Sequence, residues 1–131
     1  MEHRNVTMIR RAVDVYNVGD HDAMRPFLSE RILWHVGGNH ELSGDYEGVE
    51  AVIDYFRRVR RATAGTLQVE PIDILANDRH ASIFMKVTAI RETRQMDVMM
   101  AEALTLDPDG RWTEYWALAD DQDAVDRFWA R

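Results

Sequence analysis

Cysteine is missing from the 131 residues, which excludes disulfides, thiolate nucleophiles and cysteine-based metal sites. Hydrophobic runs long enough to span a membrane are missing as well, and the opening stretch MEHRNVTMIRR lacks the apolar centre of a signal peptide. Basic residues are outnumbered, with 16 Lys and Arg against 23 Asp and Glu, so a net charge of −7 repels nucleic acid and anionic membranes. We therefore expect a cytoplasmic protein that binds neither nucleic acid nor a membrane.

The motifs of several large enzyme classes are also missing. The sequence contains no phosphate-binding glycine loop, no nucleophile elbow and no dinucleotide-binding fingerprint. His40 and Glu41 could contribute to a metal site, but no second pair of ligands stands at a recognisable spacing from them. We therefore expect no metal site and no bound cofactor.

The length and composition favour one folded domain over residues 1–131. Hydrophobic residues make up 46% of the chain and charged residues 30%, which is typical of a globular protein with a real core. Periodicity and turn residues predict, in order, helices over 5–18 and 22–28, a strand over 32–36, a polar loop over 37–48, a helix over 49–61, strands over roughly 66–76, 80–91, 96–106 and 111–119, and a last helix that Asp120 or Asp121 caps.

This order of elements predicts an α+β fold. The strands after Gly65 are separated by turn residues, such as DPDG at 107–110, so we expect them to pair as antiparallel neighbours. Three N-terminal helices would cover one face of this curved sheet, and a short C-terminal helix would follow it. A cone-shaped cavity between the sheet and the helices is a natural site for a small hydrophobic molecule.

One acidic residue interrupts the apolar row of the third long strand. Period-two alternation places Glu102 on the same face as Met100 and Leu104. A carboxylate on a buried face must be paired, hydrogen-bonded or kept neutral by a raised pKa, and each of these is typical of a functional acid. Glu102 is therefore a candidate catalytic residue. Alternatively, the strand lies at an edge or a dimer contact, and Glu102 meets water or an arginine.

A histidine stands in a second short apolar run, RILWHVGG at 31–38. An unperturbed imidazole titrates near ~6.5, so His35 can act as a general base or acid at neutral pH. Alternatively, its ring bonds a backbone carbonyl in the core. His35 and Glu102 form a catalytic pair only if both side chains face one cavity.

Bulky side chains elsewhere could line the predicted cavity. Tyr16, Trp34, Tyr55 and Trp116 would suit a flat hydrophobic ligand, and Met100 shares the face of Glu102. Aromatic residues at regular spacing also serve as plain core residues, and the sequence leaves both uses open.

Five segments, in their order along the chain, carry a resemblance to a known family: YNVGD, ILWHVGG, LSGDYEGVEAVIDYFRRV, DGRWTEYWAL and DDQDAVDRFW. With them, the chain resembles the SnoaL-like branch of the nuclear transport factor 2-like superfamily over nearly its whole length. The resemblance implies an α+β cone. It leaves the activity open, because the superfamily includes ketosteroid isomerases, polyketide cyclases, epoxide hydrolases and noncatalytic binding domains.

Taken position by position, the resemblance to the steroid isomerases implies roles for two residues. His35 falls where those enzymes carry a proton-shuttling aspartate, and Glu102 falls where they carry a protonated acid that stabilises the enolate oxygen. Their oxyanion-hole tyrosine falls on Ala12, with Tyr16 one turn away.

The leading hypothesis is an isomerase or cyclase without a cofactor. In it, His35 removes a proton next to a carbonyl and Glu102 donates a hydrogen bond to the developing oxyanion. The alternatives are a noncatalytic protein that binds a small hydrophobic molecule and a dimerisation domain. The resemblance also implies a homodimer that pairs through the exposed face of the sheet, where the alternating residues Phe84, Lys86, Thr88 and Ile90 would suit such a contact.

Overall fold

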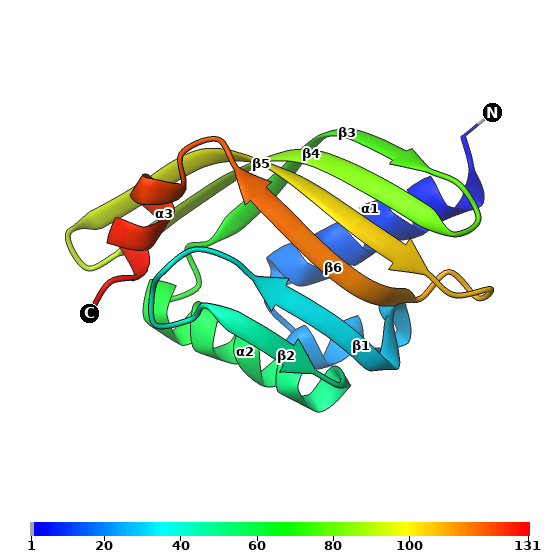
Figure 1. The fold of residues 1–131 in the computed structure, drawn as a ribbon, viewed down its shortest axis with the longest axis horizontal. Helices are drawn as coiled ribbons and strands as arrows, with labels where there is room; N and C mark the ends of the chain where they lie inside the picture. The colour runs from blue at the N-terminus through cyan, green and yellow to red at the C-terminus, as the bar shows by residue number, and fades with distance from the viewer. Residues whose placement is uncertain (1) are drawn as a thin grey trace.

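A computed structural model describes residues 2–131 as a curved sheet with helices packed against it (Figure 1). This arrangement confirms the predicted α+β class. Its elements follow the chain in this order: α1 (Arg4–Val18), the 3-10 helix η1 (His21–Phe27), β1 (Leu28–Val36), β2 (Gly44–Glu47), α2 (Val49–Thr63), β3 (Gln68–Ala76), β4 (His80–Arg91), β5 (Arg94–Leu106), β6 (Trp112–Ala119) and α3 (Gln122–Trp129).

The sheet has six strands in the order β2-β1-β6-β5-β4-β3. β1 runs parallel to β6, and every other neighbouring pair is antiparallel. The last four strands thus form the predicted antiparallel meander, and β1 with β2 extends it beyond β6. Three of the pairings contain a register shift, and such irregularities bend a strand and increase its twist. They contribute to the curvature that leaves room beneath the sheet.

Three expected elements differ in the structure. The segment 37–48, predicted as a loop, contains the edge strand β2, and β1 begins at Leu28 rather than at Ile32. Only Tyr46 of the four β2 residues is shielded from solvent, so no alternating pattern marks this strand in the sequence. The second helix is a 3-10 helix that contains Pro26, whose missing N–H disfavours a regular α-helix.

Both long helices turn an apolar face toward the sheet and end at a left-handed residue. Gly19, with a φ of 91°, ends α1 and donates its N–H to the Tyr16 carbonyl. Ala64, with a φ of 51°, ends α2. The fully buried apolar residues of the two helices include Ile9, Ala12, Val52, Ile53 and Phe56.

The C-terminal helix α3 lies across one end of the sheet and packs on β5 and β6 (Figure 1). Arg91 and Arg94, at the turn between β4 and β5, donate hydrogen bonds to the carbonyls of Phe128 and Ala130. The Arg91 guanidinium also lies 5.9 Å from the centre of the Trp129 ring. These contacts hold Trp129 against the space between the sheet and the helices.

We expect the Phe56→Ala variant to lose about 3–5 kcal/mol of unfolding free energy, because it opens a cavity in the fully buried centre of the core. Urea unfolding followed by tryptophan fluorescence measures the loss. Val18→Ala, which truncates a largely exposed side chain of α1, is the matched control and should change stability by less than about 0.5 kcal/mol. Equal losses in the two variants would contradict the assigned core.

Candidate functional site

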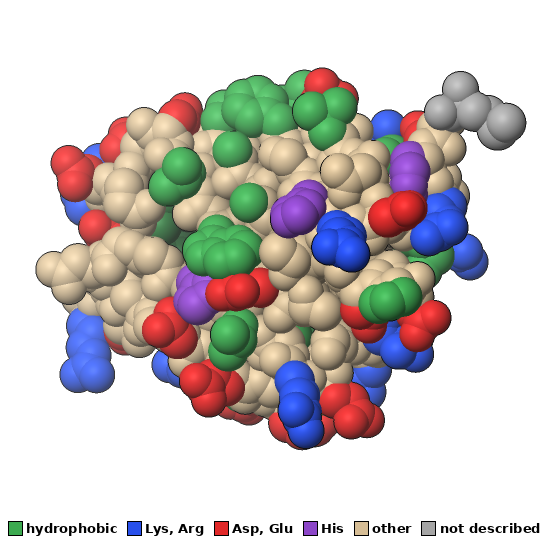
Figure 2. All heavy atoms as spheres, turned by 45° about the vertical axis from the view of Figure 1, so that its right-hand side comes forward, with side chains coloured by type: hydrophobic (Ala, Val, Ile, Leu, Met, Phe, Trp, Pro, Cys, Tyr) green, Lys and Arg blue, Asp and Glu red, His purple; other side chains and the backbone are tan. Residues whose placement is uncertain are grey.

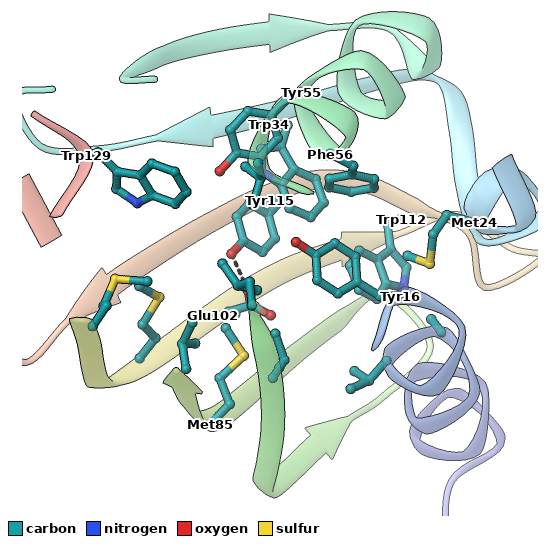
Figure 3. Close-up of a pocket in the computed structure, with 18 residues that line it drawn as sticks. Tyr16, Met24, Trp34, Tyr55, Phe56, Met85, Glu102, Trp112, Tyr115 and Trp129 are labelled. Atoms are coloured by element: carbon teal, nitrogen blue, oxygen red, sulfur yellow. Dashed lines mark hydrogen bonds between the residues drawn. The ribbon is translucent and has the colours of Figure 1, made fainter. Parts of the chain in front are cut away.

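A cavity of ≈ 110 Å³ lies between the inner face of the sheet and the helices α1 and α2. Its lining is mainly apolar, with side chains from both helices, from five of the six strands and from α3. Figure 3 shows how these side chains converge around the centre of the sheet. The aromatic residues of the lining are Tyr16, Trp34, Tyr55, Phe56, Trp112, Tyr115 and Trp129.

Glu102 is the one carboxylic acid of this lining. It lies on the inner face of β5 and is only 8% exposed. Burial raises the pKa of Glu102 to about 8, although the hydroxyl of Tyr115, which donates a hydrogen bond to Glu102 Oε2, acts in the opposite direction. The carboxyl is therefore mostly protonated at pH 7 and loses its proton slightly above neutrality, which suits a group that transfers protons.

Two further hydroxyl groups belong to the same cavity. Tyr16 comes from α1 and Tyr55 from α2, and Figure 3 shows the Tyr16 hydroxyl turned toward Glu102. Burial, reinforced by neighbouring groups that include Glu102, raises the pKa of both phenols, so both remain O–H donors at neutral pH. Neither hydroxyl has a hydrogen-bond partner within residues 2–131, and both can therefore bond an oxygen of a ligand.

An aromatic stack fixes the wall opposite α1. Trp34 on β1 lies beside Tyr115 on β6 in the parallel register, and their rings stack with centres 3.6 Å apart. Phe56 meets the Trp34 ring edge to face at 5.1 Å. Because this stack holds the Tyr115 ring, it also fixes the hydroxyl that bonds Glu102.

Five of the seven sequence-predicted site residues line the cavity: Tyr16, Trp34, Tyr55, Met100 and Glu102. His35 and Trp116 do not.

His35 lies on the outer face of the sheet, because its neighbour Trp34 points inward and side chains alternate along a strand. Its Nδ1 is 2.6 Å from Asp45 Oδ1 and its Nε2 is 2.7 Å from Glu114 Oε2. Both hydrogen bonds raise the pKa of His35, and the bond to Asp45 contributes most. An imidazole can donate to two carboxylates only when both nitrogens carry a proton, so this geometry favours the charged form.

The structure therefore does not bring His35 and Glu102 together. The sheet separates them, and the pair that the leading hypothesis requires does not face one cavity. The individual role of each residue in catalysis stays a prediction.

Trp116 is 40% exposed and stacks on the outer side of the His35 ring, with centres 5.4 Å apart. A register shift explains why Trp116 points outward. Leu106 pairs with Trp112 and Thr105 with Glu114, so Thr113 is an extra residue in β6. Alternation counted from Trp112 predicts that Trp116 points inward, whereas the shift turns Tyr115 inward instead.

Within residues 2–131, no group of three or more His, Asp or Glu side chains is arranged to hold a metal ion. In the same part of the chain, no helix combines the length and apolar character that crossing a membrane requires.

We expect Glu102 to make stability depend on pH. The unfolded carboxyl loses its proton near 4.5 and the folded one near 8, so the folded state binds more protons between these values. The free energy of unfolding should therefore fall as pH rises from about 4.5 to about 8. Glu102→Gln cannot ionise and should gain a few kcal/mol relative to the wild type across this range.

Urea unfolding at pH 5, 7 and 9 measures this difference. Glu70→Gln, which removes an exposed carboxylate from β3, is the matched control and should follow the pH dependence of the wild type. A constant difference between Glu102→Gln and the wild type at all three pH values would show that Glu102 titrates as it does in the unfolded chain.

Comparison with known proteins identifies the family of this chain. The sequence matches the model of the SnoaL-like domain over residues 9–115, and no curated protein matches it. The solved structure of Bal32a, from a soil-derived mobile gene cassette, is 27% identical, with a TM-score of 0.90 and 95% of each chain covered.

Two more distant structures share the fold. One, from Xanthomonas campestris, is a protein of unknown function with a cystatin-like fold; it is 22% identical, with a TM-score of 0.89, and covers 97% of this chain and 98% of its own. The other is SalBIII, an epoxide hydrolase/cyclase-like enzyme with a role in pyran ring formation in salinomycin. It is 17% identical, with a TM-score of 0.75, and covers 92% of this chain and 93% of its own. Because the family model matches most of the sequence, this chain belongs to the SnoaL-like domain family.

Proposed function

We propose that the protein is an isomerase or cyclase that moves a proton next to a carbonyl group of a small apolar molecule, without a cofactor. The observation that carries the proposal is Glu102, a single carboxyl with a pKa of about 8 at the wall of an apolar cavity. Among the lining residues, only Glu102 changes its charge near neutral pH, since the other ionisable groups there are tyrosines. Proton transfer is therefore assigned to Glu102 rather than to His35.

The proposed step uses the ionised form of Glu102. The carboxylate takes a proton from the carbon beside the carbonyl, the C–H electrons form an enolate, and the protonated acid then returns the proton to another carbon of the substrate. The hydroxyls of Tyr16 and Tyr55 would donate hydrogen bonds to the enolate oxygen. The apolar lining favours this arrangement, because hydrogen bonds to a developing charge are stronger where water is excluded.

Exchange of carbon-bound hydrogen tests the step without knowledge of the natural substrate. Cyclohexanone is incubated with the protein in D₂O, and loss of the proton signal beside the carbonyl is followed by NMR. We expect the rate to rise with pH through about 8 and to fall by about 10²-fold or more in Glu102→Gln. Glu114→Gln removes a carboxylate on the outer face of the sheet and should leave the rate unchanged. Equal loss in both variants would contradict the assignment.

A noncatalytic binding protein is the second candidate function. The position of His35 outside the cavity favours it, because only one proton-transfer group then faces the ligand. In that case cyclohexanone binds, as line broadening in the same NMR samples would show, but its hydrogens do not exchange faster than in buffer.

We also propose that the chain forms a homodimer through the outer face of the sheet. Phe84, Trp116 and the 77% exposed Leu118 lie there with Ala101 and Ala103 between them in the strand register. Figure 2 shows exposed hydrophobic side chains among histidine and charged groups on the surface. Exposed apolar side chains grouped in this way support a protein contact.

Sedimentation at micromolar concentration measures the dimer. We expect a dimer for the wild type and a monomer for Leu118→Asp, because a charge would be buried in the contact. Val18→Asp, which changes an exposed apolar residue at the end of α1, should remain dimeric. A monomeric wild type would contradict the proposal.

A further inference from the structure

A second, much smaller hollow adjoins the main cavity. It lies between the C-terminal ends of α1 and α2 and the start of β3, and Tyr16, Val59 and Leu67 line both spaces. Its volume of ≈ 10 Å³ holds one group of the size of a water molecule or a single oxygen atom. In contrast to the main cavity, its lining is largely polar, with His21 and Arg60 among its members.

Arg60 carries a positive charge that no acidic side chain of residues 2–131 neutralises, whereas Arg57, one turn earlier on α2, bonds Asp22 at 2.8 Å. The Arg60 guanidinium instead lies over the backbone of Gly19. A Cβ atom at Gly19 would fall 1.4 Å from Arg60 Nη1, so a larger residue there would displace the guanidinium from this position. The left-handed turn that ends α1 thus also positions this charge beside the hollow.

His21 is a second polar residue of the hollow, and one of its ring nitrogens lacks a hydrogen-bond partner within residues 2–131. It is only 6% exposed, and its Nδ1 is a buried side-chain atom without a hydrogen-bond partner in the described residues. Its ring is held against Tyr16, with centres 5.1 Å apart. An unpartnered buried nitrogen costs free energy, which a bond to a ligand could recover.

Two other polar side chains of the hollow are already used within the protein. The Asn17 side chain exchanges two hydrogen bonds with the backbone of Val69, and the Thr63 hydroxyl donates to the Val59 carbonyl. Arg60 and His21 therefore remain for a ligand. A guanidinium is a specific partner for a carboxylate, and a protein of net charge −7 would otherwise repel an acid.

We propose that Arg60 and His21 bind one carboxylate oxygen of a ligand whose apolar body occupies the main cavity, so that the natural ligand is a small apolar acid. The inference rests on the proposed function in one respect, because both place the ligand in the main cavity. It assigns the polar end of the ligand to the ends of α1 and α2, and the apolar end to the aromatic wall around Trp34. Tyr16, which lines both spaces, lies where the two ends of the ligand join.

A pair of compounds that differ only in charge tests the inference. 4-Phenylbutyrate carries a carboxylate on a short chain, and 4-phenylbutanamide has the same shape without the charge. Titration calorimetry at pH 7 measures the affinity of each. We expect the wild type to prefer the acid by about tenfold or more, the worth of one charge-assisted hydrogen bond. Arg60→Gln should lose this preference through weaker binding of the acid, with the amide unchanged.

Arg61→Gln is the matched control, because it removes the same charge from the next residue of α2, whose side chain does not line the hollow. It should keep the preference for the acid. His21→Phe keeps a ring against Tyr16 but removes both nitrogens, and we expect it to weaken binding of the acid only. Melting temperatures of all three variants establish that they are folded.

Equal affinity of the wild type for acid and amide, absence of acid binding, or equal losses in Arg60→Gln and Arg61→Gln would each overturn the inference. Its failure is distinguishable from failure of the proposed function, because cyclohexanone has no carboxylate and reports on Glu102 alone.

Discussion

The extra residue in β6 decides which side chains reach the cavity. Because Thr113 interrupts the pairing with β5, Trp112 and Tyr115 both point inward, three positions apart. Tyr115 can then stack on Trp34 and donate its hydroxyl to Glu102. Without the shift, alternation from Trp112 would turn Glu114 toward the same cavity as Glu102, and a second carboxyl would have to be buried there.

The same shift arranges the outer face. It turns Glu114 and Trp116 away from the core, where Glu114 accepts a hydrogen bond from His35 and Trp116 stacks on the His35 ring. Asp45 on β2 bonds the other ring nitrogen, so one imidazole joins three neighbouring strands. His35 thereby links the short edge strand β2 to the sheet, a structural role that the sequence alone does not reveal.

Much of the fold could be predicted because regular periodicity survives in its longest elements. The helical spacing in α1 and α2 and the unbroken alternation along β5 each mark a buried face, and the latter places Glu102 correctly among apolar neighbours. Tyr16 and Tyr55 reach the cavity for the same reason. The features that escaped prediction depend on partners far along the chain. β2 has too few residues for a pattern, and Trp116 depends on a register shift that only pairing with β5 creates.

The orientation of His35 illustrates a different limit of prediction from sequence. A histidine next to a tryptophan in an apolar strand fits either face, and the sequence does not say which of the two is buried. In the structure Trp34 points inward, where burial of its large ring contributes most to stability. His35 points outward, where its ring nitrogens bond two carboxylates. Glu102 lies in the opposite environment, since its one hydrogen bond within residues 2–131 comes from the Tyr115 hydroxyl and no basic side chain there pairs with it. On the outer face of the sheet, solvent and opposite charges stabilise ionised groups. On the inner face, burial without an opposite charge favours the neutral form of Glu102. The proposed proton transfer therefore uses the inner group, because its charged form is the one that the cavity disfavours.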